Sequence, residues 1–278
     1  MNKNFSLFLA VPLVVPMVLA LSAGGCINMG QAKFQRTVTA SATMATPKPV
    51  KISTENGSVT VTRSSTGQIE ITADSALQTA ERRDAFSIRA EADGDAFVIE
   101  PVWPDGKRSS GERCAFVIAL PESAGLTIET SNGAIEISAF SGDTHLHTSN
   151  GRITVNGHEG PLDLHTSNGA INATKLNGTL KARTSNGRIT VAFAQGATGP
   201  IDAKTSNGAI DLDVPDSFAG VLSLSTSNGN VKVEAANGAK ADIKKRSGTI
   251  TFVTAGSPST IETSNGSITV KHAPAGSQ

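Results

Sequence analysis

Three histidines and one aspartate occur at a spacing that can support metal chemistry. His145 and His147 flank one apolar residue, and Asp163 and His165 repeat the arrangement 18 residues later. If segments 18 residues apart lie side by side, the four side chains form a rectangle of roughly 5 Å by 7 Å, set by strand separation and the two-residue repeat. Imidazole and carboxylate ligands at that distance suit zinc or copper. These four residues are therefore the candidate metal ligands.

The alternative is a solvated polar face that happens to contain histidine. When successive repeats are aligned, the same column continues as Arg183, Lys204, Ser225 and Lys244. Such a column accepts almost any polar group, and this favours the solvated face over a dedicated metal site.

The positions of these residues follow from an internal repeat built on the tetrapeptide Thr-Ser-Asn-Gly. Its asparagines are Asn132, Asn150, Asn168, Asn186, Asn207, Asn228 and Asn265, with Ser247 of an Arg-Ser-Gly sequence standing in for one copy. The spacings are 18, 18, 18, 21, 21, 19 and 18 residues, and Asn56 belongs to an earlier copy. A period near 18 residues indicates a repeat architecture.

Each repeat contains two short strands with one apolar face. Apolar residues stand three and five positions after each Asn, as in Ile135 and Ile137, and another stands four positions before it, as in Leu164 and Ile243. Alternation of this kind is typical of half-buried strands. We expect the Asn-Gly corner between the strands to need a positive φ angle, which Gly adopts freely and Asn tolerates.

Two all-β folds are compatible with this pattern. An Asn-Gly pair between alternating apolar residues also indicates a two-residue hairpin, which would give an antiparallel β-sandwich. The recurrence of Thr, Ser, Asn and Gly at the same offsets favours a parallel β-solenoid with coils of about 18 residues, because stacked coils bring identical residues into columns. The Asn side chains listed above would then form a hydrogen-bonded ladder.

The N-terminus has the features of an export signal. Lys3 precedes a long uncharged stretch that ends in Ala23-Gly24-Gly25-Cys26, and the next charged residue is Lys33. This pattern resembles a bacterial lipoprotein signal, in which Cys26 would carry the lipid and become the first residue of the mature chain. The alternatives are another kind of cleaved signal and an uncleaved membrane anchor. Pro12 inside the apolar stretch and the small residues that follow this stretch argue against the uncleaved anchor.

Composition narrows the function further. Lys plus Arg and Asp plus Glu are 24 each, so there is no strong charge to attract nucleic acid. Trp103 is the one tryptophan and tyrosine is absent, so few aromatic rings are available for a nucleobase or a sugar to stack on. With Cys26 lipidated, Cys114 has no partner for a disulfide, and its apolar neighbours predict a buried, unreactive thiol. We expect no cofactor.

The sequences TENGSVTV, AFVIALPESAGLTIETSNGAIEIS and the serial TSNGxIxV segments resemble the bacterial putative-adhesin β-strand repeat family. That resemblance implies a β-helical stack outside the cytoplasm with no assigned catalytic residues. The expected organisation is a signal peptide at 1–25, a lipidated tether at 26–33, an irregular β cap at 34–120, the regular repeat at 121–271 and a polar tail at 272–278.

The expected function is therefore that of a non-enzymatic, lipid-anchored module of the cell envelope, on the periplasmic or cell-surface side, that binds an envelope polymer or protein. Two alternatives are a sensory accessory in envelope stress signalling and a β-helical carbohydrate-active enzyme. A carbohydrate-active enzyme of this kind would need a pair of carboxylates on the outer face. Asp211 and Asp213 flank Leu212 and point outward, but the residues expected beside them in the neighbouring repeats, Thr190 and Lys232, supply no second acid.

Overall fold

The computed structural model describes residues 18–20, 33–197, 199–215, 218–234, 239–252 and 256–273. Cys26, most of the expected signal peptide and residues 274–278 of the expected tail lie outside these ranges. Among the described residues, no helix has the length and apolar character needed to cross a bilayer.

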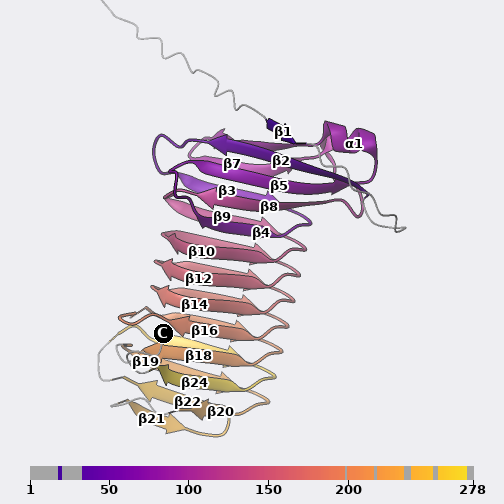
Figure 1. Ribbon diagram of the computed structural model, residues 1–278. Coiled ribbons are helices and arrows are strands. Elements are labelled where there is room, and N and C mark those ends of the chain that lie inside the picture. Colours follow the sequence, from indigo (N-terminus) through magenta and orange to yellow (C-terminus); the bar gives the residue numbers. More distant parts are fainter. Residues whose placement is uncertain are drawn as a thin grey trace, which may run out of the picture.

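Two large, mostly parallel β-sheets lie face to face and form an elongated stack (Figure 1). One sheet has the order β1-β2-β5-β8-β4-β10-β12-β14-β16-β18-β24-β20, and the other has the order β21-β22-β19-β23-β17-β15-β13-β11-β9-β3-β7-β6. The two strands that flank each Thr-Ser-Asn-Gly corner belong to opposite sheets. The antiparallel sandwich is therefore wrong, and the fold is a β-solenoid.

We call each pair of strands joined by an Asn-Gly corner a rung. The eight rungs, in spatial order, are β3–β4 (Pro49–Thr54, Val59–Arg63), β9–β10 (Gly125–Thr130, Ile135–Ser141), β11–β12 (Asp143–Thr148, Ile153–Glu159), β13–β14 (Leu162–Thr166, Ile171–Asn177), β15–β16 (Leu180–Thr184, Ile189–Phe193), β17–β18 (Ile201–Thr205, Ile210–Pro215), β23–β24 (Ser259–Thr263, Ile268–Ala273) and β19–β20 (Val221–Thr226, Val231–Val233). Neighbouring rungs pair in parallel, so that Ile135 lies opposite Ile153 and Ile153 opposite Ile171.

The core consists of columns of aliphatic side chains that run along the stack. One column contains Val59, Ile135, Ile153, Ile171, Ile189, Ile210, Ile268 and Val231, all buried. A bulge in three neighbouring rungs places Ala139, Gly157 and Lys175 at positive φ. After this bulge Phe140, His158 and Leu176 share one further buried column.

An irregular cap covers the N-terminal end of the stack. It comprises β1 (Val18–Ala20), β2 (Phe34–Ala42), β5 (Ile69–Leu77), α1 (Ala80–Ala85), β6 (Ser87–Asp93), β7 (Ala96–Val102), the 3-10 turn η1 (Pro104–Gly106) and β8 (Arg113–Leu120). β2, β5 and β8 pair antiparallel, and β8 then pairs in parallel with β4 of the first rung. The antiparallel strands end the parallel stack, which protects its edge from further pairing.

A buried carboxylate holds this cap together. Glu112 is fully buried and accepts hydrogen bonds from Arg82 at 2.7 and 2.8 Å and from the backbone N–H groups of Ser109 and Gln78. Burial alone would raise the pKa of Glu112, but the hydrogen bonds from Arg82 and the two backbone donors outweigh it and lower this pKa to about 2. The charged carboxylate therefore ties α1 to the segment before β8.

The rungs do not stack in chain order at the C-terminal end, in contrast to the expectation from the repeat. β23–β24 lies between β17–β18 and β19–β20 (Figure 1). As a consequence, Lys204 is followed in its column by Glu262 and then Ser225, and Asp211 lies opposite Thr269 rather than Lys232.

The repeat assigned to Ser247 is also wrong. β21 (Lys240–Ile243) and β22 (Ser247–Thr251) form an antiparallel hairpin, and β22 pairs antiparallel with β19. Ile243, expected to face the core, is 36% exposed, although Ile250 and Phe252 are buried. The hairpin closes this end of the stack, because no Thr-Ser-Asn-Gly corner is present there to continue it.

Candidate functional site

The asparagines of the corners form one hydrogen-bonded column along an edge of the stack. In each case Nδ2 donates to Oδ1 of the asparagine in the neighbouring rung, at 2.7 Å between Asn132 and Asn56 and at 2.8 Å elsewhere. The order is Asn56, Asn132, Asn150, Asn168, Asn186, Asn207, Asn265, Asn228. These amides are engaged with one another, so the column stabilises the stack and offers few free groups to a ligand.

The threonines of the corners serve the stack in the same way. Thr54 of the first rung donates to the carbonyl of Cys114 in the cap. In every later rung the hydroxyl donates to a glycine carbonyl of the neighbouring rung, as from Thr148 to Gly133 and from Thr166 to Gly151, both at 2.9 Å. Thr148 and Thr166 are fully buried. A buried hydroxyl needs such a partner, and the glycine carbonyl supplies it.

The glycines of the corners are required by close stacking, and this corrects the expected positive φ angle. The corner residues Asn168 and Gly169 are not among the residues with positive φ. A Cβ atom added to Gly169 would overlap the carbonyl oxygen of Gly151 in the neighbouring rung. Positive φ occurs instead at the opposite corner, at Gly142 (φ 99°) and Gly160 (φ 112°).

The four candidate metal ligands lie on adjacent rungs, on the outer face of their sheet. His145 is opposite Asp163, and His147 is opposite His165 with 4.8 Å between the ring centroids. The side chains have other partners: His145 Nε2 lies 3.2 Å from Asp143 Oδ1, and Lys181 Nζ lies 3.0 Å from Asp163 Oδ2. Within the described ranges, no three His, Cys, Asp or Glu side chains are grouped closely enough to hold a metal ion.

The electrostatics of this patch disfavour a second positive charge. Partial burial, and next the ring of His147, lower the pKa of His165, while Asp163 opposes the shift. Lys181 and Arg183 add further positive potential. The patch therefore holds His165 neutral at neutral pH, with its ring against that of His147.

An open groove of about 580 Å³ runs along the same face, near the corner opposite the Asn column. Its lining includes Asp143, Asp163, Lys181, Asp202 and Thr260, which come from five consecutive rungs. Five rungs correspond to about 20 Å along the stack at the usual strand separation. The groove is thus long and lies along the stack axis.

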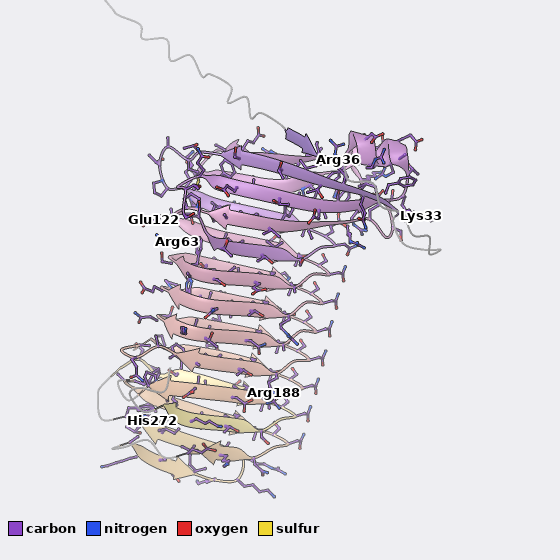
Figure 2. The ribbon with its side chains drawn as sticks, in the orientation of Figure 1. Lys33, Arg36, Arg63, Glu122, Arg188 and His272 are labelled. Carbon is purple, nitrogen blue, oxygen red and sulfur yellow. The ribbon has the colours of Figure 1, made fainter. Side chains whose placement is uncertain are left out.

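Ion pairs between rungs line and flank this groove. Lys181 pairs with Asp163, Arg183 with Asp202, and Lys204 with Glu262. All six side chains are between about one third and three fifths exposed, so each pair contributes little to stability. On the other sheet Arg188 pairs with Asp211 at 2.8 Å, and Figure 2 shows Arg188 at the edge of the stack where the corners align.

The acid pair considered for an enzyme is not assembled into a catalytic arrangement. Asp211 is bound to Arg188, while partial burial raises the pKa of Asp213, with Lys271 opposing the shift. Asp213 lies opposite Lys271 in the next rung. The two aspartates therefore differ in environment, but among the described residues their rung neighbours supply no further acid.

Sequence reasoning missed a buried histidine. His158 is 2% exposed and lies in the core column between Phe140 and Leu176. Its Nε2 is 3.3 Å from the carbonyl oxygen of Pro161, and its Nδ1 has no hydrogen-bond partner. The bulge at Gly157 turns this side chain inward, and an Asn-Gly-His-Glu-Gly turn gives no periodicity from which burial could be predicted.

Two further residues have defined environments near the cap. Trp103 packs against Phe86 with 5.2 Å between ring centroids, and it lines a second groove of about 330 Å³ together with Glu100, Glu129 and His147. Cys114 is fully buried in β8, and burial raises the pKa of its thiol to about 12. The predicted burial of this thiol is confirmed, and at neutral pH it is protonated and unreactive.

Comparison with known proteins agrees with this architecture. The family model described as Toastrack DUF4097 matches residues 122–271, more than half of the chain. The chain belongs to this family. Its model covers the parallel rungs from β9 onward, with the C-terminal hairpin. No curated protein matches the chain.

Solved structures that match the chain come from several bacteria. A putative adhesin from Bacteroides fragilis is 14% identical, with a TM-score of 0.41, and the match covers 86% of this chain and 97% of that one. A putative adhesin from Parabacteroides distasonis is 12% identical, with the same TM-score and coverage. A putative cell adhesion protein from Clostridium sporogenes is 12% identical, with a TM-score of 0.35 and coverage of 86% and 100%.

Proposed function

We propose that the protein is a non-enzymatic binding module of the cell envelope, anchored by lipid on Cys26, that holds an extended envelope polymer along its stack. The observation that carries this proposal is the groove of about 580 Å³ that crosses five rungs. A groove that follows the stack axis fits an extended chain better than a compact small molecule. Three aspartates, a histidine, a lysine and two threonines of its lining offer polar contacts at intervals of one rung, and prolines and aliphatic residues make up the rest of the lining.

The arrangement of the functional groups supports binding over catalysis. The repeated Thr, Asn and Gly residues serve contacts between rungs, and their side chains do not converge on one point. The charged groups of the groove are paired with one another, as Lys181 is with Asp163. Catalysis by paired acids needs two carboxyl groups that face one substrate, whereas Asp163 and Asp202 of the groove are each engaged by a cation of a neighbouring rung.

A panel of purified envelope polysaccharides, scored for both retention and product release, tests this function. Thr179 lines the groove and is exposed, so Thr179→Trp should block the groove and lower retention at least about tenfold. Thr190→Trp, on the outer face of the opposite sheet, is the matched control and should leave retention unchanged. Equal retention by both variants would exclude the groove, and release of oligosaccharide would show that the protein is an enzyme.

The membrane anchor is tested separately. We expect the wild-type chain to be found in the membrane fraction, with a lipid-modified Cys26 at its N-terminus by mass spectrometry. Cys26→Ser removes the sulfur that accepts the lipid, so its N-terminal peptide should carry no lipid. A wild-type protein that retains residues 1–25 and has no lipid on Cys26 would instead support the uncleaved anchor.

A further inference from the structure

The rung β23–β24 is inserted between two rungs that follow each other in the chain. β18 ends at Pro215 and β19 begins at Val221, yet β23 pairs with both β17 and β19, and β24 with both β18 and β20. The chain therefore passes over one rung position and later returns to fill it. We propose that residues 259–273 exchange between two copies of this chain, so that each molecule of a dimer supplies the inserted rung of the other.

The contacts of the inserted rung are the same as those between all other rungs. Asn265 donates to Asn207 and accepts from Asn228, both at 2.8 Å. The hydroxyl of Thr263 donates to the carbonyl of Gly208 at 2.8 Å. Because these bonds join residues that are distant in the chain, the corresponding segment of a second copy satisfies them equally well.

The position between the two rungs accepts a segment that carries the residues of the repeat. A Cβ atom on Gly266 would overlap the carbonyl oxygen of Gly208, so the occupant needs glycine at its corner. It also needs threonine two residues before the asparagine, to reach the glycine carbonyl, and aliphatic residues at the positions of Ile261 and Ile268, which are fully buried. A second copy of this chain carries all of these features in register.

The order of folding makes the exchange accessible. Both neighbours of the inserted rung precede it in the chain, by 58 residues at Asn207 and by 37 at Asn228, so a chain that folds from its N-terminus reaches them before it reaches residues 259–273. Until then two sheet edges are unpaired and open to another chain. Exchange of an identical element is a low-cost route to a dimer, and the effective concentration of the chain's own segment opposes it. The dimer should therefore increase with protein concentration.

Opposed residues in neighbouring strands allow a direct test. Lys204 and Glu262 lie opposite each other in β17 and β23, and are exposed enough for substitution. Neighbouring strands lie within the range of Cα separations that a disulfide spans. Lys204→Cys and Glu262→Cys are placed in separate, differently tagged full-length chains, both with Cys26→Ser. The two chains are unfolded together, refolded at several concentrations and oxidised.

The matched control uses Asp163→Cys and Lys181→Cys, which form the same kind of opposed ion pair between consecutive rungs. We expect the disulfide heterodimer of the Lys204→Cys and Glu262→Cys chains to exceed that of the control by at least about tenfold at high concentration. Equal yields for the two mixtures would overturn the proposal. With both substitutions in one chain, dilute protein should form an intrachain disulfide, and its absence would also overturn the proposal, because it would contradict the register.

Discussion

Asn265 donates a hydrogen bond to Asn207 at 2.8 Å, although 58 residues separate the two. Asn228 is closer to Asn207 in the chain but bonds to Asn265 instead. Any Thr-Ser-Asn-Gly corner is complementary to any other, since each offers the same amide, hydroxyl and carbonyl groups. The repeat thus specifies how two rungs bind each other, but it leaves open which two rungs are neighbours.

The glycine of a corner should tolerate no side chain. Gly169→Ala forces the Cβ atom into the carbonyl of Gly151, so neighbouring rungs must separate. We expect the free energy of unfolding to fall by about 3 kcal/mol or more, measured by urea denaturation. Ser167→Ala in the same corner is the control and should change stability by less than about 0.5 kcal/mol. Similar stability of the two variants would contradict the steric role of glycine.

A charge in the Asn column should make stability depend on pH. Asn168 donates to Asn150 and accepts from Asn186. Asn168→Asp replaces the donor amide by a carboxylate that faces Asn150 Oδ1. The hydrogen bond between the two residues is then lost, and the free energy of unfolding should fall by about 1 kcal/mol at neutral pH. The carbonyl oxygen raises the pKa of the new carboxyl group, so stability should recover as pH falls and the group becomes a donor. Asn168→Ala lacks this recovery, and parallel pH profiles of the two variants would count against the ladder.

The buried His158 should destabilise the protein in acid. Burial lowers its pKa, opposed by backbone carbonyl contacts and by the nearby carboxylates of Glu159 and Asp143. Since the unfolded chain then binds the proton more readily, stability falls as pH drops below about 6.5 and levels off below the folded pKa. His158→Leu copies Leu176 of the next rung and should remove this component between pH 7 and 5. Unchanged pH dependence in the variant would place the titration elsewhere.

One substitution should stabilise the protein. Thr144 lies in a buried column between Leu126 and Leu162, and its hydroxyl has no hydrogen-bond partner. Thr144→Val removes the unsatisfied hydroxyl at nearly constant volume and should raise the free energy of unfolding by about 1 kcal/mol. Thr166→Val removes a hydroxyl that is bonded to Gly151, so it should lower stability by a similar amount. The two thermal shifts should have opposite signs.

The metal hypothesis has a defined outcome in solution. Because Asp163 is held by Lys181 and the rings of His147 and His165 pack together, we expect zinc or copper to leave the melting temperature unchanged. A resident metal would stabilise the folded state by mass action. A rise in melting temperature that disappears in His147→Ala, but persists in His272→Ala, would establish the site.

The repeat pattern of the sequence by itself favoured a parallel stack over a sandwich of hairpins, and it identified most of the core. Period-two alternation identified the inward residues, such as Ile135 and Leu164, because the side chains of a strand alternate between faces. Thr, Ser, Asn and Gly recur at the same offsets in successive repeats. This indicated columns of identical residues along the stack, because stacked asparagine side chains can hydrogen-bond to one another. These features are local, or repeat at a fixed spacing, and can therefore be read from a linear pattern.

Three features became apparent only in the folded chain: the order of the last rungs, the reason for the corner glycines and the burial of His158. Gly169 could be explained only when Gly151 was seen against it, because a close approach between distant backbones leaves no trace in local conformational preference. Asn207 takes Asn265 as its neighbour for a related reason: equivalent corners compete for one position. In the folded chain β22 of the hairpin occupies one edge of β19 and β23 the other, an arrangement that no single repeat encodes.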